Sequence, residues 1–192
     1  TTEKDDLYVN IINLGGIQPL KNQLEFIEMA ILLLQNNKKL KFYVVGPTID
    51  QEYKNRLDEV IMNSGFGNNI IFTGLQNNIP KILSQMDILV HNNINESFGR
   101  IYIEAMAAGI PVVTYNSETA KEILSNGKTG VLIPIGDKSK MVLAITELIN
   151  SSEKRIKIGK FGRTKVRDEY SVDKQFKRIN NIYNKILTNK YE

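Results

Sequence analysis

The sequence predicts an α/β domain of the Rossmann-like type: three layers, with a six-stranded parallel sheet between two layers of helices. Short runs rich in β-branched and aromatic residues alternate along the chain with longer runs whose apolar residues recur at helical spacing. The first β-α-β unit consists of strand-like residues 8–14 and 41–45 around helix-like residues 24–34. Because crossovers between parallel strands are right-handed, repeated units of this kind place helices on both faces of the sheet.

The remaining elements follow the same alternation. Four more strand-like runs occupy residues 70–73, 88–91, 111–115 and 130–133, and the helix-like runs among them lie at 51–63, 79–85, from about 99 and at 119–125. Beyond Asp137 the pattern is helical, at 140–150, 152–169 and 172–187. Because three consecutive closing helices exceed what one sheet face needs, we expect a Rossmann-like domain over residues 1–170. We expect residues 171–192 to form a closing helix that packs against an N-terminal domain outside this sequence.

The composition excludes several kinds of protein. The 192 residues include no cysteine, which rules out disulfides, thiolate metal sites and cysteine chemistry and fits a cytoplasmic protein. No apolar run approaches the roughly 20 residues that a membrane-spanning helix needs. A net charge of +4 suits nucleic acid, an anionic membrane surface or a phosphorylated ligand. The basic residues are densest at 154–190, where their helical spacing is typical of a solvated helix face.

The strongest chemical pattern lies at residues 96–111. Open α/β sheets bind ligands beyond the carboxyl ends of their strands, so the loop that follows residue 91 should line a site. In this loop Glu96 precedes Gly99, where the chain turns into a helix whose first backbone N–H groups can bind an anion. Glu104 lies five residues past Gly99, or roughly 7–8 Å along the helix axis. Since carboxylates accept hydrogen bonds from vicinal sugar hydroxyls, the spacing predicts sugar, diphosphate and ribose bound in that order.

These residues resemble the signature of a known family. The pattern E-S-F-G-x4-E-A-M-A-x-G-x-P-V, which begins at Glu96, is similar to that of the group 1 (family 4) retaining glycosyltransferases, whose two Rossmann-like domains form the GT-B arrangement. The resemblance runs from about residue 8 to about residue 187 and implies a C-terminal, donor-binding domain. It implies that Glu96 contacts hydroxyls of the donor sugar and that Glu104 contacts the nucleotide ribose. The same donor-binding segment includes Ser97, Phe98, Gly99, Arg100 and Ile101. The resemblance implies that backbone amides around Phe98, Gly99 and Arg100 cap the sugar and phosphate.

The first loop departs from the family in one position. Residues 14–22 are similar to the family segment G-R-L-x3-K-[GN], whose Arg and Lys hold the donor diphosphate, and Lys21 keeps its place while Gly16, after Gly15, occupies the Arg position. A lysine near the first turn of a helix opposes the macrodipole unless an anion is present. We therefore expect Lys21 to bind phosphate and to act in catalysis together with Glu96. Without the Arg, a charge-assisted bond to the donor diphosphate, worth about 1.5–3 kcal/mol, is lost. Three alternatives follow: weaker donor binding, replacement by a cation such as Arg100, and a non-catalytic protein.

Three further positions carry weaker signals. Leu75 resembles a family position that borders the nucleotide base. Ser117 and Glu118 follow a strand where related proteins approach the diphosphate, but either could instead cap the next helix. His91 is the only histidine. Because no acid, nucleophile or second ligand is identifiable as its partner, we expect it to be structural and not the catalytic base.

The resemblance implies transfer of a sugar from a nucleoside diphosphate sugar to an acceptor hydroxyl, with retention, in polysaccharide, lipopolysaccharide or glycolipid synthesis. We expect no metal and no other cofactor, and we expect the acceptor sugar or lipid-linked glycan to bind the N-terminal domain. Peripheral association of the full-length protein with the inner face of the membrane is compatible with this role. The donor base stays open among UDP, GDP and ADP.

Three other functions compete with this interpretation. A non-catalytic module that binds nucleotide sugars and needs a separate acceptor-binding chain is the main alternative, because of Gly16. A sugar-nucleotide epimerase would need acids and bases that the sequence does not offer. A nucleic-acid-binding protein is disfavoured, since the basic residues lack interleaved aromatic residues.

Overall fold

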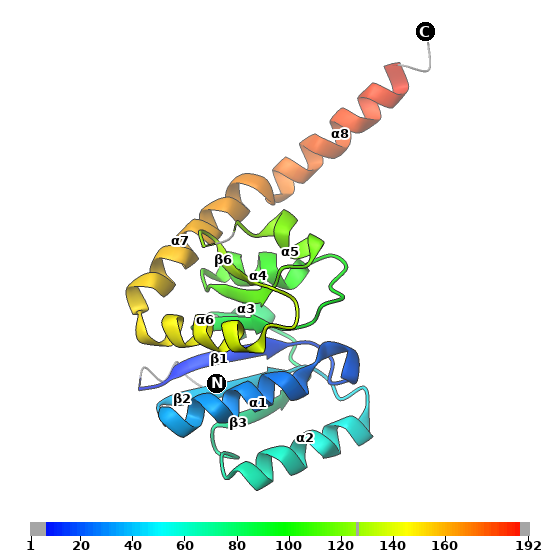
Figure 1. The fold of residues 1–192 in the computed structure, drawn as a ribbon. Coiled ribbons are helices and arrows are strands. Elements are labelled where there is room, and N and C mark those ends of the chain that lie inside the picture. The colour runs from blue at the N-terminus through cyan, green and yellow to red at the C-terminus, as the bar shows by residue number, and fades with distance from the viewer. Residues whose placement is uncertain (1–6, 126, 189–192) are drawn as a thin grey trace.

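The computed structural model describes residues 7–125 and 127–188, and it confirms the predicted three-layer α/β/α fold. One parallel sheet has the strand order β3-β2-β1-β4-β5-β6 (Figure 1). The strands are β1 (Val9–Leu14), β2 (Leu40–Val45), β3 (Ile70–Gly74), β4 (Ile88–His91), β5 (Val112–Tyr115) and β6 (Gly130–Ile133). The order reverses between β1 and β4, so the carboxyl ends of these two strands form the switch point at which open α/β sheets bind ligands.

Helices cover both faces of the sheet, as predicted. One face carries α1 (Gln23–Asn36), α2 (Gln51–Ser64) and α6 (Lys138–Asn150), and the other carries α3 (Ile79–Leu83), α4 (Arg100–Ala108) and α5 (Glu118–Ile123). Successive strand residues enter opposite cores: Ile11 packs with the first helix layer and Ile12 with the second. Because both faces are buried, the strands are almost continuously apolar, which is why the sequence showed them clearly.

Local side-chain chemistry sets the helix boundaries. The side chains of Asp50, Ser117, Asp137 and Ser151 each accept a hydrogen bond from the backbone N–H three residues later, which caps α2, α5, α6 and α7 (Ser152–Glu169). Ser117 therefore serves as a helix cap. The helices expected at 79–85 and 119–125 are shorter, ending at Leu83 and Ile123. A 3-10 turn, η1 (Pro19–Lys21), precedes α1.

Helix α7 packs closely against α4, in the second helix layer. A Cβ atom at Gly159 would overlap the carbonyl oxygen of Gly109, at the end of α4, so only glycine allows this approach. Gly162, also on α7, lies against the side chain of Met106 on α4. This contact ties the closing part of the chain to α4, the helix that begins at the motif.

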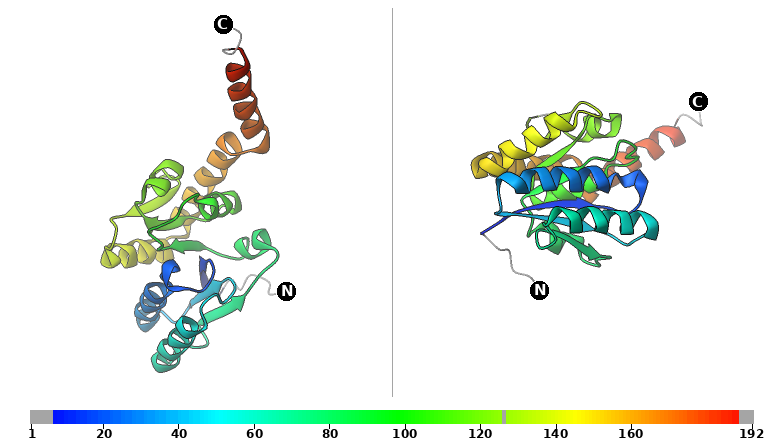
Figure 2. Two further views of the ribbon diagram at one scale, coloured as in Figure 1. Left: turned by 90° about the vertical axis from the view of Figure 1, so that its right-hand side faces the viewer. Right: turned by 60° about the horizontal axis from the view of Figure 1, so that its bottom comes forward.

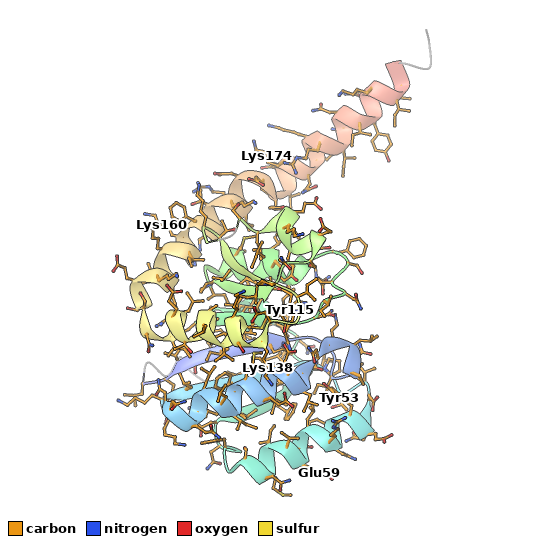
Figure 3. The ribbon with its side chains drawn as sticks, in the orientation of Figure 1. Tyr53, Glu59, Tyr115, Lys138, Lys160 and Lys174 are labelled. Carbon is orange, nitrogen blue, oxygen red and sulfur yellow. The ribbon has the colours of Figure 1, made fainter. Side chains whose placement is uncertain are left out.

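The last helix, α8 (Val172–Thr188), extends away from the sheet and its covering helices (Figures 1 and 2). Every described side chain from residue 172 to residue 187 is exposed. Figure 3 shows Lys174 projecting from α8, whereas Tyr115 lies inside the body of the domain. Among the described residues, none of the helices combines the length and apolar character needed to cross a membrane. The packing of α8 on another domain stays a prediction.

Candidate functional site

A pocket of about 340 Å³ lies at the switch point, beyond the carboxyl ends of β1 and β4. It collects side chains from the end of β1, the η1 turn, the end of β4, the loop that follows it and the first turns of α4. Its lining residues are Leu14, Lys21, His91, Glu96, Phe98, Arg100, Ile101 and Glu104. The two glutamates and the lysine that the sequence singled out therefore meet in one place.

Glu96 is held from three directions. Its Oε1 accepts a hydrogen bond from the Gly99 backbone N–H at 3.2 Å. Its Oε2 lies 3.2 Å from His91 Nε2 and 3.6 Å from Lys21 Nζ. Only 16% of the Glu96 side chain is exposed. Contacts within the protein therefore fix this carboxylate at the base of the pocket.

These contacts favour the ionised form of Glu96. The approach of His91 Nε2 is the main reason why the pKa of Glu96 falls to about 2, and Lys21 and the Gly99 amide act in the same direction, while burial opposes them. Glu96 is therefore an acceptor of hydrogen bonds at physiological pH and has no proton to donate. A residue with this property suits contact with hydroxyl groups and does not suit general acid catalysis.

Lys21 is positioned by the turn between β1 and α1. It ends η1, and the next residue, Asn22, takes the left-handed conformation with φ 54°. The Lys21 stem passes over Gly15, where an added Cβ would lie 3.5 Å from Lys21 Cδ. The Lys21 side chain is 29% exposed, so its ammonium group is accessible from the pocket. The left-handed turn and the small residue below it together aim the cation at Glu96.

A partly buried polar network, which we call the β1–β4 junction, fixes this turn. It consists of Asn13, Asn22, Glu25, Asn92 and Tyr115. Asn13 Nδ2 donates to Asn92 Oδ1 at 3.2 Å, and Asn92 Nδ2 donates to the Asn22 carbonyl oxygen at 2.7 Å. Asn22 Nδ2 donates to Glu25 Oε2 at 3.1 Å, and the Tyr115 hydroxyl donates to Glu25 Oε1 at 2.6 Å. The loop that carries Lys21 is thereby tied to both β4 and β5.

Arg100 and Glu104 form the other wall of the pocket. They lie one helical turn apart on α4, with Arg100 Nε 3.2 Å from Glu104 Oε1. The Arg100 side chain is 86% exposed, whereas that of Glu104 is 34% exposed. Gly99 is the N-cap of α4 and is left-handed at φ 60°, so the first amides of this helix open beside Glu96. A phosphate at this helix start would have Lys21 and Arg100 as its available cations.

Some predicted residues lie elsewhere. Leu75 is exposed after β3, and Ser97 is exposed in the motif loop; neither lines this pocket. Gly16 lies against the loop after β2, where an added Cβ would come within 2.8 Å of Ile49 Cγ1. The Ile49 side chain therefore fills the space into which a side chain at position 16 would have to grow.

The sequence interpretation missed two parts of the site. His91, expected to be structural, is buried and approaches Glu96, its neighbour five residues later in the chain. The junction was not predicted either, although Asn13 in an apolar strand and Asn92 directly after another were a usable signal. Buried asparagines are uncommon and must find hydrogen-bond partners.

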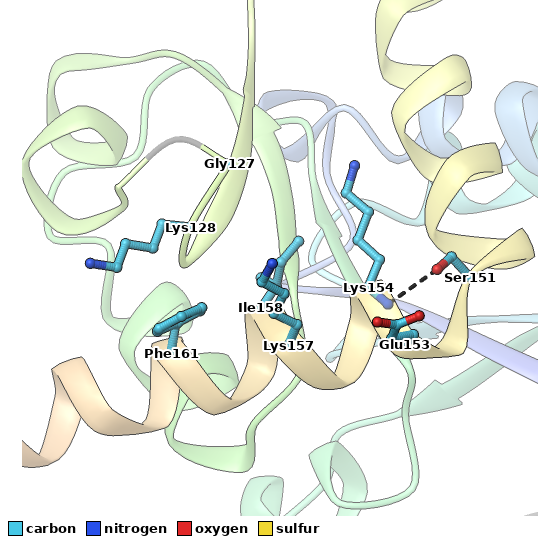
Figure 4. Close-up of a pocket in the computed structure, with 8 residues that line it drawn as sticks. All are labelled: Gly127, Lys128, Ser151, Glu153, Lys154, Lys157, Ile158 and Phe161. Carbon is cyan, nitrogen blue, oxygen red and sulfur yellow. Dashed lines mark hydrogen bonds between the residues drawn. The ribbon is translucent and has the colours of Figure 1, made fainter.

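A larger pocket, of about 540 Å³, has no residue of the motif in its lining. Figure 4 shows its lining residues. Its walls include Lys128, just before β6, and Lys154, Lys157 and Phe161 on α7. It therefore opens at the amino end of β6, whereas α/β sheets bind their ligands at the carboxyl ends. The smaller pocket is the candidate site, because it lies at the carboxyl ends of the strands and brings Lys21, Glu96 and Glu104 together. No cluster of three or more metal-binding side chains occurs within residues 7–125 and 127–188.

The fold agrees with solved structures of related proteins. The Anabaena protein Alr3699/HepE, in complex with UDP and glucose, has a TM-score of 0.85 at 23% identity, over 93% of this chain and 48% of that one. The C-terminal domain of the group 1 family protein LpcC from Francisella tularensis has a TM-score of 0.78 at 28% identity, over 86% of this chain and 87% of that one. The second comparison shows that a domain of this extent crystallises by itself.

Sequence comparison points to the same family. The capsular polysaccharide biosynthesis glycosyltransferase CapM of Staphylococcus aureus is 29% identical over 182 residues, which cover 90% of this chain and 45% of CapM. The chain spans about half the length of the curated relatives it matches. Residues 2–165 match the family described as Glycosyl transferases group 1. The chain therefore belongs to the group 1 glycosyltransferases.

Proposed function

We propose that this chain binds the nucleoside diphosphate sugar donor for a retaining glycosyltransferase of cell-envelope polysaccharide, lipopolysaccharide or glycolipid synthesis. The observation that carries the proposal is the geometry around the start of α4. Glu96 precedes the free amides of this helix, Glu104 follows them, and Lys21 Nζ lies 3.6 Å from Glu96. This arrangement offers acceptors for hydroxyls on both sides of an anion site.

The proposed chemistry places each group in a separate role. The diphosphate binds the amides at the start of α4 and Lys21, which stabilise the charge that develops on the leaving group as the sugar departs. Glu96 accepts hydrogen bonds from hydroxyls of the donor sugar, and Glu104 accepts them from the ribose. Arg100 supplies the second cation that Gly16 does not, by turning from Glu104 toward the phosphates. No metal is required in this proposal, because cations and helix dipole neutralise the diphosphate.

The relatives support the class of donor and of product. Alr3699/HepE was crystallised with UDP and glucose, and CapM acts in capsular polysaccharide biosynthesis. For this chain we propose UDP as the first nucleotide to test. The acceptor, a sugar or a lipid-linked glycan, would bind a separate N-terminal domain, and the exposed apolar side chains of α8 would pack against that domain. Contact of the full-length protein with the inner membrane face belongs to the same proposal.

The test is a thermal-shift panel with UDP, GDP, ADP and their sugars. We expect one nucleotide series to stabilise the chain, with the affinity lowered about tenfold or more by Lys21→Ala or Glu104→Ala. Lys128→Ala, in the pocket on α7, is the matched control and should leave the affinity unchanged. Absence of any shift at millimolar ligand, or an equal loss with Lys128→Ala, would contradict the proposed site.

A non-catalytic nucleotide-sugar-binding module is the second candidate, favoured by Gly16 and by the Ile49 side chain beside it. The two functions differ in one measurement on the complete polypeptide. An enzyme releases nucleoside diphosphate from its donor and forms a product whose anomeric configuration, read by NMR, matches the donor. A module binds the donor and releases nothing.

A further inference from the structure

His91 is buried at the base of the pocket, with 2% of its surface exposed. Its Nε2 lies 3.2 Å from Glu96 Oε2, and neither ring nitrogen has a hydrogen-bond partner among the described residues. Burial of polar nitrogens without partners is unfavourable, and native proteins rarely tolerate it without a functional reason. The reason here lies in the group that His91 faces.

The His91 ring is held in place by its packing against Tyr102. His91 packs edge-on against Tyr102, with ring centroids 5.3 Å apart at 85°. The Tyr102 hydroxyl is in turn within 3.2 Å of Thr114 Oγ1, on β5. With its ring fixed by α4 and β5, His91 holds Nε2 close to Glu96 Oε2. The Glu96 carboxylate is carried by the loop between β4 and α4.

We propose that His91 is a positioning residue. It orients Glu96 from the base of the pocket, so that the side of the carboxylate away from His91 faces the donor sugar. The inference rests on the proposed function and assigns His91 to sugar recognition, not to nucleotide binding. Both ring nitrogens are shielded from solvent, so a ligand cannot reach them while Glu96 is in place. His91 therefore acts through Glu96 and does not touch the sugar. Lys21 and the Gly99 amide are the other groups that contact this carboxylate.

The first test measures Glu96 itself and needs no ligand. The carboxyl pKa of Glu96 is followed by carbon NMR and assigned with Glu96→Gln. We expect a value near 2 in the parent chain and a rise toward the ordinary value in His91→Phe. Phenylalanine keeps the edge contact with Tyr102 but has no nitrogen. Thr129→Val, which removes another buried hydrogen-bonding side chain far from the pocket, should leave the Glu96 pKa where it was. An unchanged pKa in folded His91→Phe would overturn the proposal.

The second test separates sugar from nucleotide. Affinities for UDP-glucose and UDP, or for whichever sugar nucleotide and nucleotide the panel selects, are measured by calorimetry. We expect His91→Phe to weaken sugar-nucleotide binding at least fivefold while bare-nucleotide binding stays within twofold. His91→Gln, whose amide can reach a similar position, should recover most of the loss. Equal losses for both ligands would mean a purely structural role and would refute the proposal.

A double-mutant cycle identifies the route of the effect. If His91 acts through Glu96, His91→Phe has no further effect on sugar affinity in a Glu96→Gln background. An undiminished loss in that background would show direct contact with the sugar and overturn the positioning role. If the parent chain binds no nucleotide at all, the proposed function fails, and the NMR titration still decides whether His91 controls Glu96.

Discussion

The β1–β4 junction and helix α8 differ in which kind of side chain they bury and which they expose. In the junction, buried and half-buried polar side chains satisfy one another: Asn13 is 2% exposed and Asn92 is fully buried, while Asn22 and Glu25 are half-buried. On α8, large apolar side chains are exposed, with Phe176 at 63% and Val172 at 83%. Exposed apolar surface and buried polar groups are the two informative departures from ordinary globular packing. The junction ties the loop that carries Lys21 to β4 and β5, and α8 presents an exposed apolar surface suited to contact with another protein surface.

The largest expected effect comes from the turn beside the junction. Gly46 has φ +149°, and a Cβ there would lie 2.2 Å from the Gly15 carbonyl oxygen, which is too close for any side chain. We expect Gly46→Ala to destabilise the chain by about 3 kcal/mol, measured by urea unfolding, because the β1 loop must move away from β2. It should also weaken nucleotide binding, since the same loop carries Lys21.

Gly67→Ala is the control for this change. Gly67 is not left-handed, and an added Cβ would come no closer than 4.0 Å to Ile61 Cγ2. Its unfolding free energy should stay within about 0.5 kcal/mol of the parent value. Equal effects at the two glycines would mean that the β1 loop is not tightly held.

The sequence was sufficient for the sheet and for the motif, and insufficient for the junction. Strands such as 88–91 are visible because continuous apolar residues must be buried on both faces. The motif is visible because Glu96, Gly99 and Glu104 are close in sequence. Asn13 and Asn92, by contrast, are 79 positions apart and meet only through the parallel register of β1 with β4. The approach of His91 to Glu96 depends on how the loop between them folds, which periodicity does not describe.

A smaller effect is expected at the far side of the junction. Tyr115 is buried, and burial is the main reason why the pKa of its hydroxyl is raised; the hydrogen bond to Glu25 acts in the same direction. The hydroxyl therefore stays protonated and donates to Glu25 Oε1 at 2.6 Å. Tyr115→Phe removes a charge-assisted hydrogen bond, so we expect a loss of about 1.5–2 kcal/mol in unfolding free energy. Tyr183→Phe on α8 is matched in chemistry but exposed, and should change nothing measurable. A comparable loss at both tyrosines would remove the distinction between the two regions.

The contribution of Glu96 should depend on pH. Its pKa is lowered in the folded chain from 4.5 to about 2, so its stabilising contribution is complete above about pH 5 and is lost as the pH falls toward 2. We expect Glu96→Gln to be less stable than the parent by about 1 kcal/mol at pH 6, after allowance for screening by solvent. The gap should narrow in urea titrations between pH 4.5 and pH 3. A gap that widens on acidification would show that Glu96 is not held as an anion.

The smallest effect on stability is expected on α8. Val172, Phe176, Ile179, Tyr183 and Ile186 recur at intervals of three and four and so form one apolar stripe along this helix. Because none of these side chains is buried, we expect Ile179→Lys to change the unfolding free energy by less than about 0.5 kcal/mol. Ile158→Lys, on α7 with 2% exposure, is the matched control and should be severely destabilising.

Ile179→Lys should lower stability in any form of the protein in which another domain covers this apolar stripe. In the complete polypeptide, Ile179→Lys introduces a charge into the proposed contact with the N-terminal domain, and thermal unfolding should then occur at a lower temperature than in the parent. If Ile179→Lys destabilises the 192-residue chain as much as Ile158→Lys does, α8 packs back on its own domain in solution. In that case its stripe contributes to this core, and the contrast with the junction disappears. If neither protein is affected, the stripe is not an interdomain surface.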